Sequence, residues 1–180
     1  MWLERQPQGV YLAIVGGGEA IEAMRTLDRL HHLDQTEMHW RCITMLDATF
    51  EIAFEILRIA VPSLRVIQSY DQLQLFREML HKEHSTGKQL ILVRVKSFYD
   101  QLAVTAPREK PLVPEIGWQT TSDTLAMYLA HMTDSKRCVL LKSCSVDGLA
   151  TLGDAVAEGM IDAQVIKYAA EDIRCELITL

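Results

Sequence analysis

The chain has 180 residues, of which 49% are hydrophobic and 23% charged, and its net charge is −6. This length and composition are typical of a folded globular protein, so we expect a single domain over residues 1–180. The acidic balance argues against a nucleic-acid partner. No apolar run approaches the ~20 residues that span a bilayer, which argues against a membrane partner.

Short apolar runs alternate with segments of helical periodicity along the whole chain. The predicted strands are Val10–Val15, Leu64–Ile67, Leu90–Val95, Cys138–Leu141 and Cys175–Leu180. The predicted helices are Glu19–His31, Gln35–Ala60, Tyr70–His81, Ser122–Met132 and Ala163–Glu171. Asp34 and Ser69 are predicted to cap helices, and Pro62 to end the long one. The alternation predicts an α/β fold with a mainly parallel central sheet and helices on both faces.

Three consecutive glycines, Gly16, Gly17 and Gly18, separate the first predicted strand from the first helix. Glycines let the backbone approach a ligand, and the N–H groups of a helix N-terminus attract anions. Ile21 stands where a dinucleotide-binding fingerprint needs its third glycine, and no P-loop triplet occurs in the chain. The turn therefore predicts a phosphate or carboxylate site, with a tight turn that binds nothing as the alternative.

Residues 106–118 contain three of the five prolines and interrupt the alternation. A long, stiff loop in a compact domain is either a substrate lid or a plain crossover, and the sequence favours neither. Thr120 and Thr121 follow as alternative N-caps of the next helix. Asp123 in its first turn either complements the helix dipole or projects into the crevice at the strand ends, beside the glycine turn. There it would position a cation or a phosphate-binding lysine.

Lys142, Ser143 and Ser145 lie at the carboxyl end of a predicted strand, followed by the turn dipeptide Asp147-Gly148. In parallel sheets ligands bind at the carboxyl ends of strands, so an ammonium and two hydroxyls there suit the phosphates or ribose of a nucleotide. The alternative is an ordinary surface turn.

The histidines and cysteines indicate no metal site and no disulfide framework. His81 and His84 fall on a solvated turn, whereas His39 and Trp40 either line a substrate pocket or belong to the core. The four cysteines are widely spaced and form no C-x-x-C pair; they are Cys42, Cys138, Cys144 and Cys175. This spacing predicts buried thiols in a cytoplasmic protein.

Four segments in this order resemble the amino acid kinase superfamily, which includes aspartate, glutamate, acetylglutamate and uridylate kinases. They are Ala13–Gly18, Thr121–Ala126, Leu140–Leu149 and Glu158–Asp162. Residues Leu27–Trp40 resemble a narrower branch that includes the aminomethylfuran phosphate kinase of methanofuran synthesis. The resemblance implies a three-layer α/β/α sandwich that transfers the γ-phosphoryl of ATP to a small-molecule acceptor. For the branch, the implied acceptor is a phosphorylated furan or a similar metabolite of one-carbon cofactor synthesis.

The resemblance also implies roles for particular residues. Gly16, Gly17 and Gly18 would hold the acceptor or the transferring phosphoryl, with His39, Trp40 and Ser122 as further acceptor-side candidates. Asp123 is the candidate catalytic residue that orients the lysines around the transition state. Lys142, Ser143, Ser145, Asp147 and Gly148 would border the nucleotide, which carries its own Mg²⁺.

Two departures from the family pattern favour a second function. No Lys-x-Gly-Gly strand precedes Val10, so we expect the true start of the protein to lie upstream of Met1. The lysine expected shortly after Gly-Met-Ile is also absent, and Lys167 comes only later. A non-catalytic nucleotide- or metabolite-binding protein on the same fold is therefore the alternative, whereas the missing third glycine argues against a nicotinamide-dependent oxidoreductase.

We also expect a homodimer, because the helix Gln35–Ala60 has more apolar positions than one buried face needs. These positions are Trp40, Ile43, Met45, Leu46, Phe50, Ile52, Phe54, Ile56 and Leu57.

Overall fold

The structure is a computed structural model that describes residues 2–80, 87–100, 112–169 and 173–180. The chain divides into two compact units, Met1–Pro107 and Arg108–Leu180, and each is described by itself. The expectation of one domain over residues 1–180 stays a prediction. Among the helices of the described residues, none is both long enough and apolar enough to cross a membrane.

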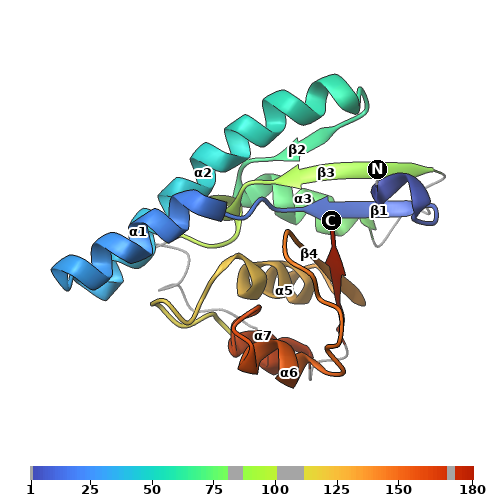
Figure 1. The fold of residues 1–180 in the computed structure, drawn as a ribbon. Coiled ribbons are helices and arrows are strands. Elements are labelled where there is room, and N and C mark those ends of the chain that lie inside the picture. The colour runs from blue at the N-terminus through green and yellow to red at the C-terminus, as the bar shows by residue number, and fades with distance from the viewer. Residues whose placement is uncertain (1, 81–86, 101–111, 170–172) are drawn as a thin grey trace. The chain divides into compact units, whose positions relative to one another are not determined.

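The first unit is built on a three-stranded parallel sheet in the order β1-β3-β2 (Figure 1). Its strands are β1 (Gly9–Ala13), β2 (Arg65–Ile67) and β3 (Lys88–Val93), and its helices are η1 (Trp2–Arg5), α1 (Gly18–His31), α2 (Gln35–Ala60), α3 (Tyr70–Leu80) and η2 (Val95–Ser97). Gly9 is in register with Lys88, and Arg65 with Ile91. The central strand β3 is thereby paired on both sides.

The ends of the first unit's helices follow from local chemistry. Asp34 caps α2 by accepting a hydrogen bond from the backbone N–H of Glu37 at 2.8 Å, as predicted. Ser69 likewise accepts from the N–H of Gln72 at 3.3 Å at the start of α3. Helix α2 ends at Ala60, two residues before Pro62, because proline cannot continue the backbone ladder.

The core of the first unit lies between β3 and the inner face of α2. Ile91, Leu92 and Val93 are consecutive and all at most 1% exposed, the pattern of a strand covered on both faces. Ile43 and Phe50 bury the inner face of α2, 3% and 2% exposed.

The second unit is a two-stranded parallel sheet, β4-β5, with three helices. The strands are β4 (Arg137–Lys142) and β5 (Arg174–Thr179), and the helices are α5 (Ser122–Met132), α6 (Leu152–Ala157) and α7 (Gln164–Ala169). Cys138 is in register with Cys175, and Lys142 with Thr179. Helix α5 packs against both β4 and α7, and its residues from Thr124 to Met132 are mostly buried.

Every predicted strand and helix is present, and the fold is mixed α/β with parallel strand pairing, as predicted; the described strands form two sheets, and the single central sheet stays a prediction. The bounds of α2 and α5 agree fully with the prediction, and the strands shift by one or two residues. The predicted ends at His81 and Glu171 lie outside the described residues. Helix α6 was not predicted, although Thr151 and Asp154 form the reciprocal hydrogen bonds of a capping box at its start.

Candidate functional site

The second unit brings Asp123 and Lys142 together at the carboxyl end of β4. The Nζ atom of Lys142 lies 2.6 Å from Oδ2 of Asp123, and both side chains are 15% exposed. Side chains alternate along a strand, so Lys142 shares the face of the buried residues Cys138 and Leu140. Asp123 reaches the same place from the first turn of α5. Two residues with separately predicted roles therefore form one partly buried ion pair.

The electrostatics of Asp123 are set by opposing effects. Burial raises the pKa of its carboxyl above the usual value, because desolvation disfavours the charged form. The hydrogen bond and charge of Lys142 lower the pKa, and the negative charge of Asp162 raises it again. Lys142 is therefore the group that opposes the effect of burial on the pKa of Asp123.

Asp162 occupies the N-terminus of α5. Its Oδ2 accepts hydrogen bonds from the N–H and hydroxyl of Thr121 at 3.0 and 2.7 Å, and from those of Thr124 at 3.3 and 2.9 Å. Thr121 is the N-cap, whereas the hydroxyl of Thr120 donates to a backbone carbonyl, so Thr121 is the correct choice of the two predicted caps. Ser122, the first residue of α5, is partly exposed. An aspartate thus already neutralises the positive end of this helix.

The loop after β4 carries the other candidate nucleotide ligands. Ser143 is exposed, as are Ser145 and Asp147, whose side chains bond each other at 2.8 Å. Gly148 has φ +85°, a conformation that favours glycine, and nothing lies within 4 Å of the position that a Cβ would take. The loop that follows Lys142 is therefore mostly exposed, and the space beside Gly148 is open.

The cysteines of this unit are not all buried as predicted. Cys138 is buried and Cys175 is half-buried, and burial raises the pKa of these thiols to about 12 and about 11. Both are therefore protonated and unreactive at neutral pH. Cys144 is exposed, which corrects the prediction for that residue, because it belongs to the loop after β4. Cys42, in the first unit, is half-buried.

The glycine turn lies in the first unit, after β1. Gly17 is the N-cap of α1, and a Cβ on it would lie 1.8 Å from Cγ1 of Ile21. Gly18 has φ +50°, which favours glycine, and Gly16 is exposed. Packing explains the glycine at position 17 and backbone geometry the glycine at position 18, so neither requires a ligand. This supports the tight-turn alternative. The exposed Gly16 remains accessible to a ligand.

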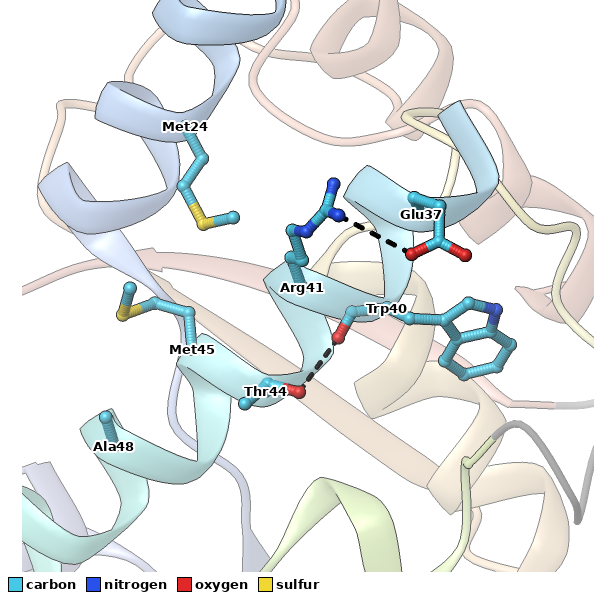
Figure 2. Close-up of a pocket in the computed structure, with 7 residues that line it drawn as sticks. All are labelled: Met24, Glu37, Trp40, Arg41, Thr44, Met45 and Ala48. Atoms are coloured by element: carbon cyan, nitrogen blue, oxygen red, sulfur yellow. Dashed lines mark hydrogen bonds and ion pairs between the residues drawn. The ribbon is translucent and has the colours of Figure 1, made fainter. Parts of the chain in front are cut away.

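His39 and Trp40, adjacent on α2, have different environments. His39 is 5% exposed, and its Nε2 lies 2.9 Å from the hydroxyl of Tyr99, so it belongs to the core. Trp40 stacks on Tyr99 and borders an open groove of about 470 Å³, which also includes Arg41. In Figure 2, Met24 and Met45 face each other across this groove, and the indole is directed away from them.

Two basic residues at the carboxyl end of β3 were missed. Arg94 pairs with Glu51, and Nζ of Lys96 lies 2.9 Å from Asp47. The predicted strand extends to Val95 and so includes Arg94 as a strand residue. A cation directly after an apolar run was the available indication. In parallel sheets the carboxyl ends of neighbouring strands share one edge, so both residues belong to the edge that carries the glycine turn.

Lys167, the later lysine of the family comparison, is on the surface of α7. Its ammonium pairs with Glu115, and both side chains are about half exposed. Gln164, which occupies one of the positions where the family carries a lysine, is 4% exposed and bonds the hydroxyl of Thr120 at 2.9 Å. These two residues hold the segment before α5 in place.

The structure thus groups the nucleotide-side candidates in one unit and the acceptor-side candidates, apart from Ser122, in the other. The expected closeness of Asp123 to the glycine turn joins the two units and stays a prediction. Residues 106–111 of the proline loop and His81 and His84 lie outside the described residues. Within the described part of the chain, no cluster of His, Cys, Asp and Glu is placed to hold a metal.

No known family model matches the chain, and no curated protein matches it significantly.

Proposed function

We propose that this chain is an ATP-dependent small-molecule phosphotransferase of the amino acid kinase type. The observation that carries the proposal is the partly buried 2.6 Å pair of Asp123 and Lys142 at the carboxyl end of a parallel strand. Binding sites of open α/β sheets lie at that end. A buried ion pair costs desolvation energy, and a site that must fix an ammonium for a phosphate gives a reason to retain one.

Lys142 would contact a phosphate group of the nucleotide, and Asp123 would act as its positioning residue. Phosphoryl transfer depends mainly on positioning and on neutralising charge on the phosphate oxygens. Asp123 and Asp162 both place negative charge near the carboxyl end of β4, and this charge repels an anion. The Lys142 ammonium is therefore needed for a phosphate to bind there.

The loop Ser143–Gly148 would border the bound nucleotide. Its exposed hydroxyls and N–H groups are donors for phosphate or ribose oxygens, and Gly148 lets the backbone approach closely. No described metal cluster would compete for Mg²⁺, and a nucleotide brings that ion already bound to its phosphates. The ion would supply further charge neutralisation there.

On the acceptor side, we propose a small aromatic metabolite with an anionic group, such as a phosphorylated furan. The groove beside Trp40 offers an aromatic edge, two methionines and the guanidinium of Arg41. The Arg41 guanidinium already contacts Glu37 at 3.6 Å on the surface, so it is a weak argument for an anionic acceptor.

The three-layer sandwich and a cytoplasmic location, where ATP is abundant and thiols stay reduced, belong to the same proposal.

A non-catalytic nucleotide-binding protein is the second candidate, and one observation favours it. Among the described residues 112–169 and 173–180, Lys142 is the only lysine or arginine at the carboxyl ends of β4 and β5. One cation suffices to hold a phosphate, whereas stabilising a transferring phosphoryl commonly takes several positive groups.

Calorimetric titration of the full chain with Mg-ATP, followed by phosphorus NMR with candidate acceptors, tests both candidates. A phosphotransferase predicts binding and the appearance of ADP with a phosphorylated acceptor. Binding without turnover over the whole acceptor panel supports the second candidate. Absence of Mg-ATP binding contradicts both.

A further inference from the structure

Helix α2 carries a second apolar face that no helix among the described residues of its own unit covers. Ile52, Ile56 and Ile59 are 62%, 62% and 79% exposed, although isoleucine is usually buried. At about 100° per residue, they lie within roughly 60° of one another and about opposite Phe50, which is buried in the core. They form one stripe, which we call the isoleucine stripe.

The stripe begins where α1 stops covering α2. Met24 of α1 lies across the groove from Met45 and Ala48, which precede the stripe on the same side of α2. Helix α1 has 14 residues and α2 has 26. At about 1.5 Å per residue, α2 is roughly 18 Å longer, so its last turns extend beyond α1 (Figure 1). The apolar face therefore continues after its intramolecular cover has ended.

An oppositely charged pair borders one side of the stripe. Arg58 and Glu55 pair at 2.6 Å, both more than half exposed. A two-fold axis that crosses α2 near Ile56 would pack two copies of the helix antiparallel and bring the same side of each copy together. Glu55 of one copy then faces Arg58 of the other, and the reverse pair forms as well. Parallel packing would separate these two sides.

We propose that the isoleucine stripe is the interface of a symmetric homodimer in which two α2 helices pack antiparallel around Ile56. In the dimer the stripe meets an identical apolar row, so each copy covers the other's exposed isoleucines. The stripe is self-complementary in charge through Glu55 and Arg58. A second copy of this chain thus satisfies both requirements with one surface, and the arrangement closes without leaving a stripe exposed.

Sedimentation equilibrium of the full chain tests the interface. The wild type is expected to dimerise, and Ile56→Glu to weaken dimerisation on the order of 100-fold or more, because it buries an unpaired charge. Ile166→Glu is the matched control, since Ile166 is a 43% exposed isoleucine on α7 and should leave the dimer unchanged. A wild type that stays monomeric over a 100-fold range of protein concentration overturns the proposal, as does an Ile56→Glu variant that dimerises like the wild type.

Charge exchange and crosslinking test the antiparallel arrangement. Glu55→Lys should weaken the dimer by placing like charges opposite each other, and adding Arg58→Glu should restore it. In a Cys144→Ser background, Ile56→Cys should oxidise readily to a covalent dimer, whereas Ile52→Cys should not, because only positions near the axis meet themselves. Equal crosslinking at both positions indicates parallel helices and overturns the antiparallel proposal.

Discussion

Replacing Lys142 with methionine should destabilise the protein strongly at neutral pH and much less under acid conditions. Methionine keeps most of the side-chain volume but leaves the Asp123 carboxylate, 15% exposed, without its cation at 2.6 Å. Breaking a buried ion pair on one side typically costs 3–5 kcal/mol of unfolding free energy. We expect about 3 kcal/mol, because the pair retains some contact with water.

The pH dependence follows from the raised pKa of Asp123. Its carboxyl has a pKa above 3.8 in the folded protein, and loss of Lys142 raises the pKa further. The folded variant therefore binds a proton more readily than the unfolded chain does. Its deficit relative to the wild type is largest above the folded pKa and shrinks as the pH falls through that value toward 3.8.

Urea unfolding followed by circular dichroism, at pH 7 and at pH 3.8, measures these free energies. The double variant Asp123→Asn with Lys142→Met removes both charges and should lie within about 1–2 kcal/mol of the wild type, so it is more stable than Lys142→Met alone. A single variant with the same deficit at both pH values, or a double variant as unstable as the single one, would refute this account of the pair.

Three further predictions concern stability. Asp162→Ala should cost about 3 kcal/mol in urea unfolding, because the fully buried Thr124 loses its acceptor; a loss below about 1 kcal/mol would contradict this. Gly17→Ala should cost about 1–3 kcal/mol through its clash with Ile21, but little in an Ile21→Ala background; equal costs would contradict it. The pKa of Glu176 is lowered by its arginine partner, so its stabilisation is present above pH 4.5 and is lost as the pH falls. Glu176→Gln should therefore cost at most about 1 kcal/mol at pH 7 and progressively less as the pH falls below 4.5; a loss that does not shrink in acid would contradict this.

Elements with strong local chemistry could be predicted from the sequence, and contacts across the fold could not. Asp34 and Thr121 mark the starts of α2 and α5 with side-chain caps, and both helices were bounded correctly. Helix α6 was not predicted, and the capping box of Thr151 and Asp154 was the indication that could have found it. Periodicity needs several turns, whereas a cap is a single-residue feature.

The candidate site shows the same division. Asp123 and Lys142 were each placed at a strand or helix end, but their pairing depends on how α5 packs over β4. His39 was considered for a pocket, and its bond to Tyr99, 60 positions away, places it in the core. The four hydrogen-bond donors that Asp162 satisfies also come from residues about 40 positions away, a separation that no local pattern encodes.

Thermal unfolding with and without millimolar Mg-ATP tests the central claim most directly. If Lys142 and its loop hold a nucleotide, the wild type should gain about 2–3 kcal/mol when the ligand exceeds its dissociation constant a hundredfold. The Asp123→Asn, Lys142→Met double variant should gain nothing, whereas the surface control Lys167→Met should respond like the wild type. A wild type that Mg-ATP leaves unshifted, or a double variant that shifts as much as the control, would contradict a nucleotide site at the end of β4.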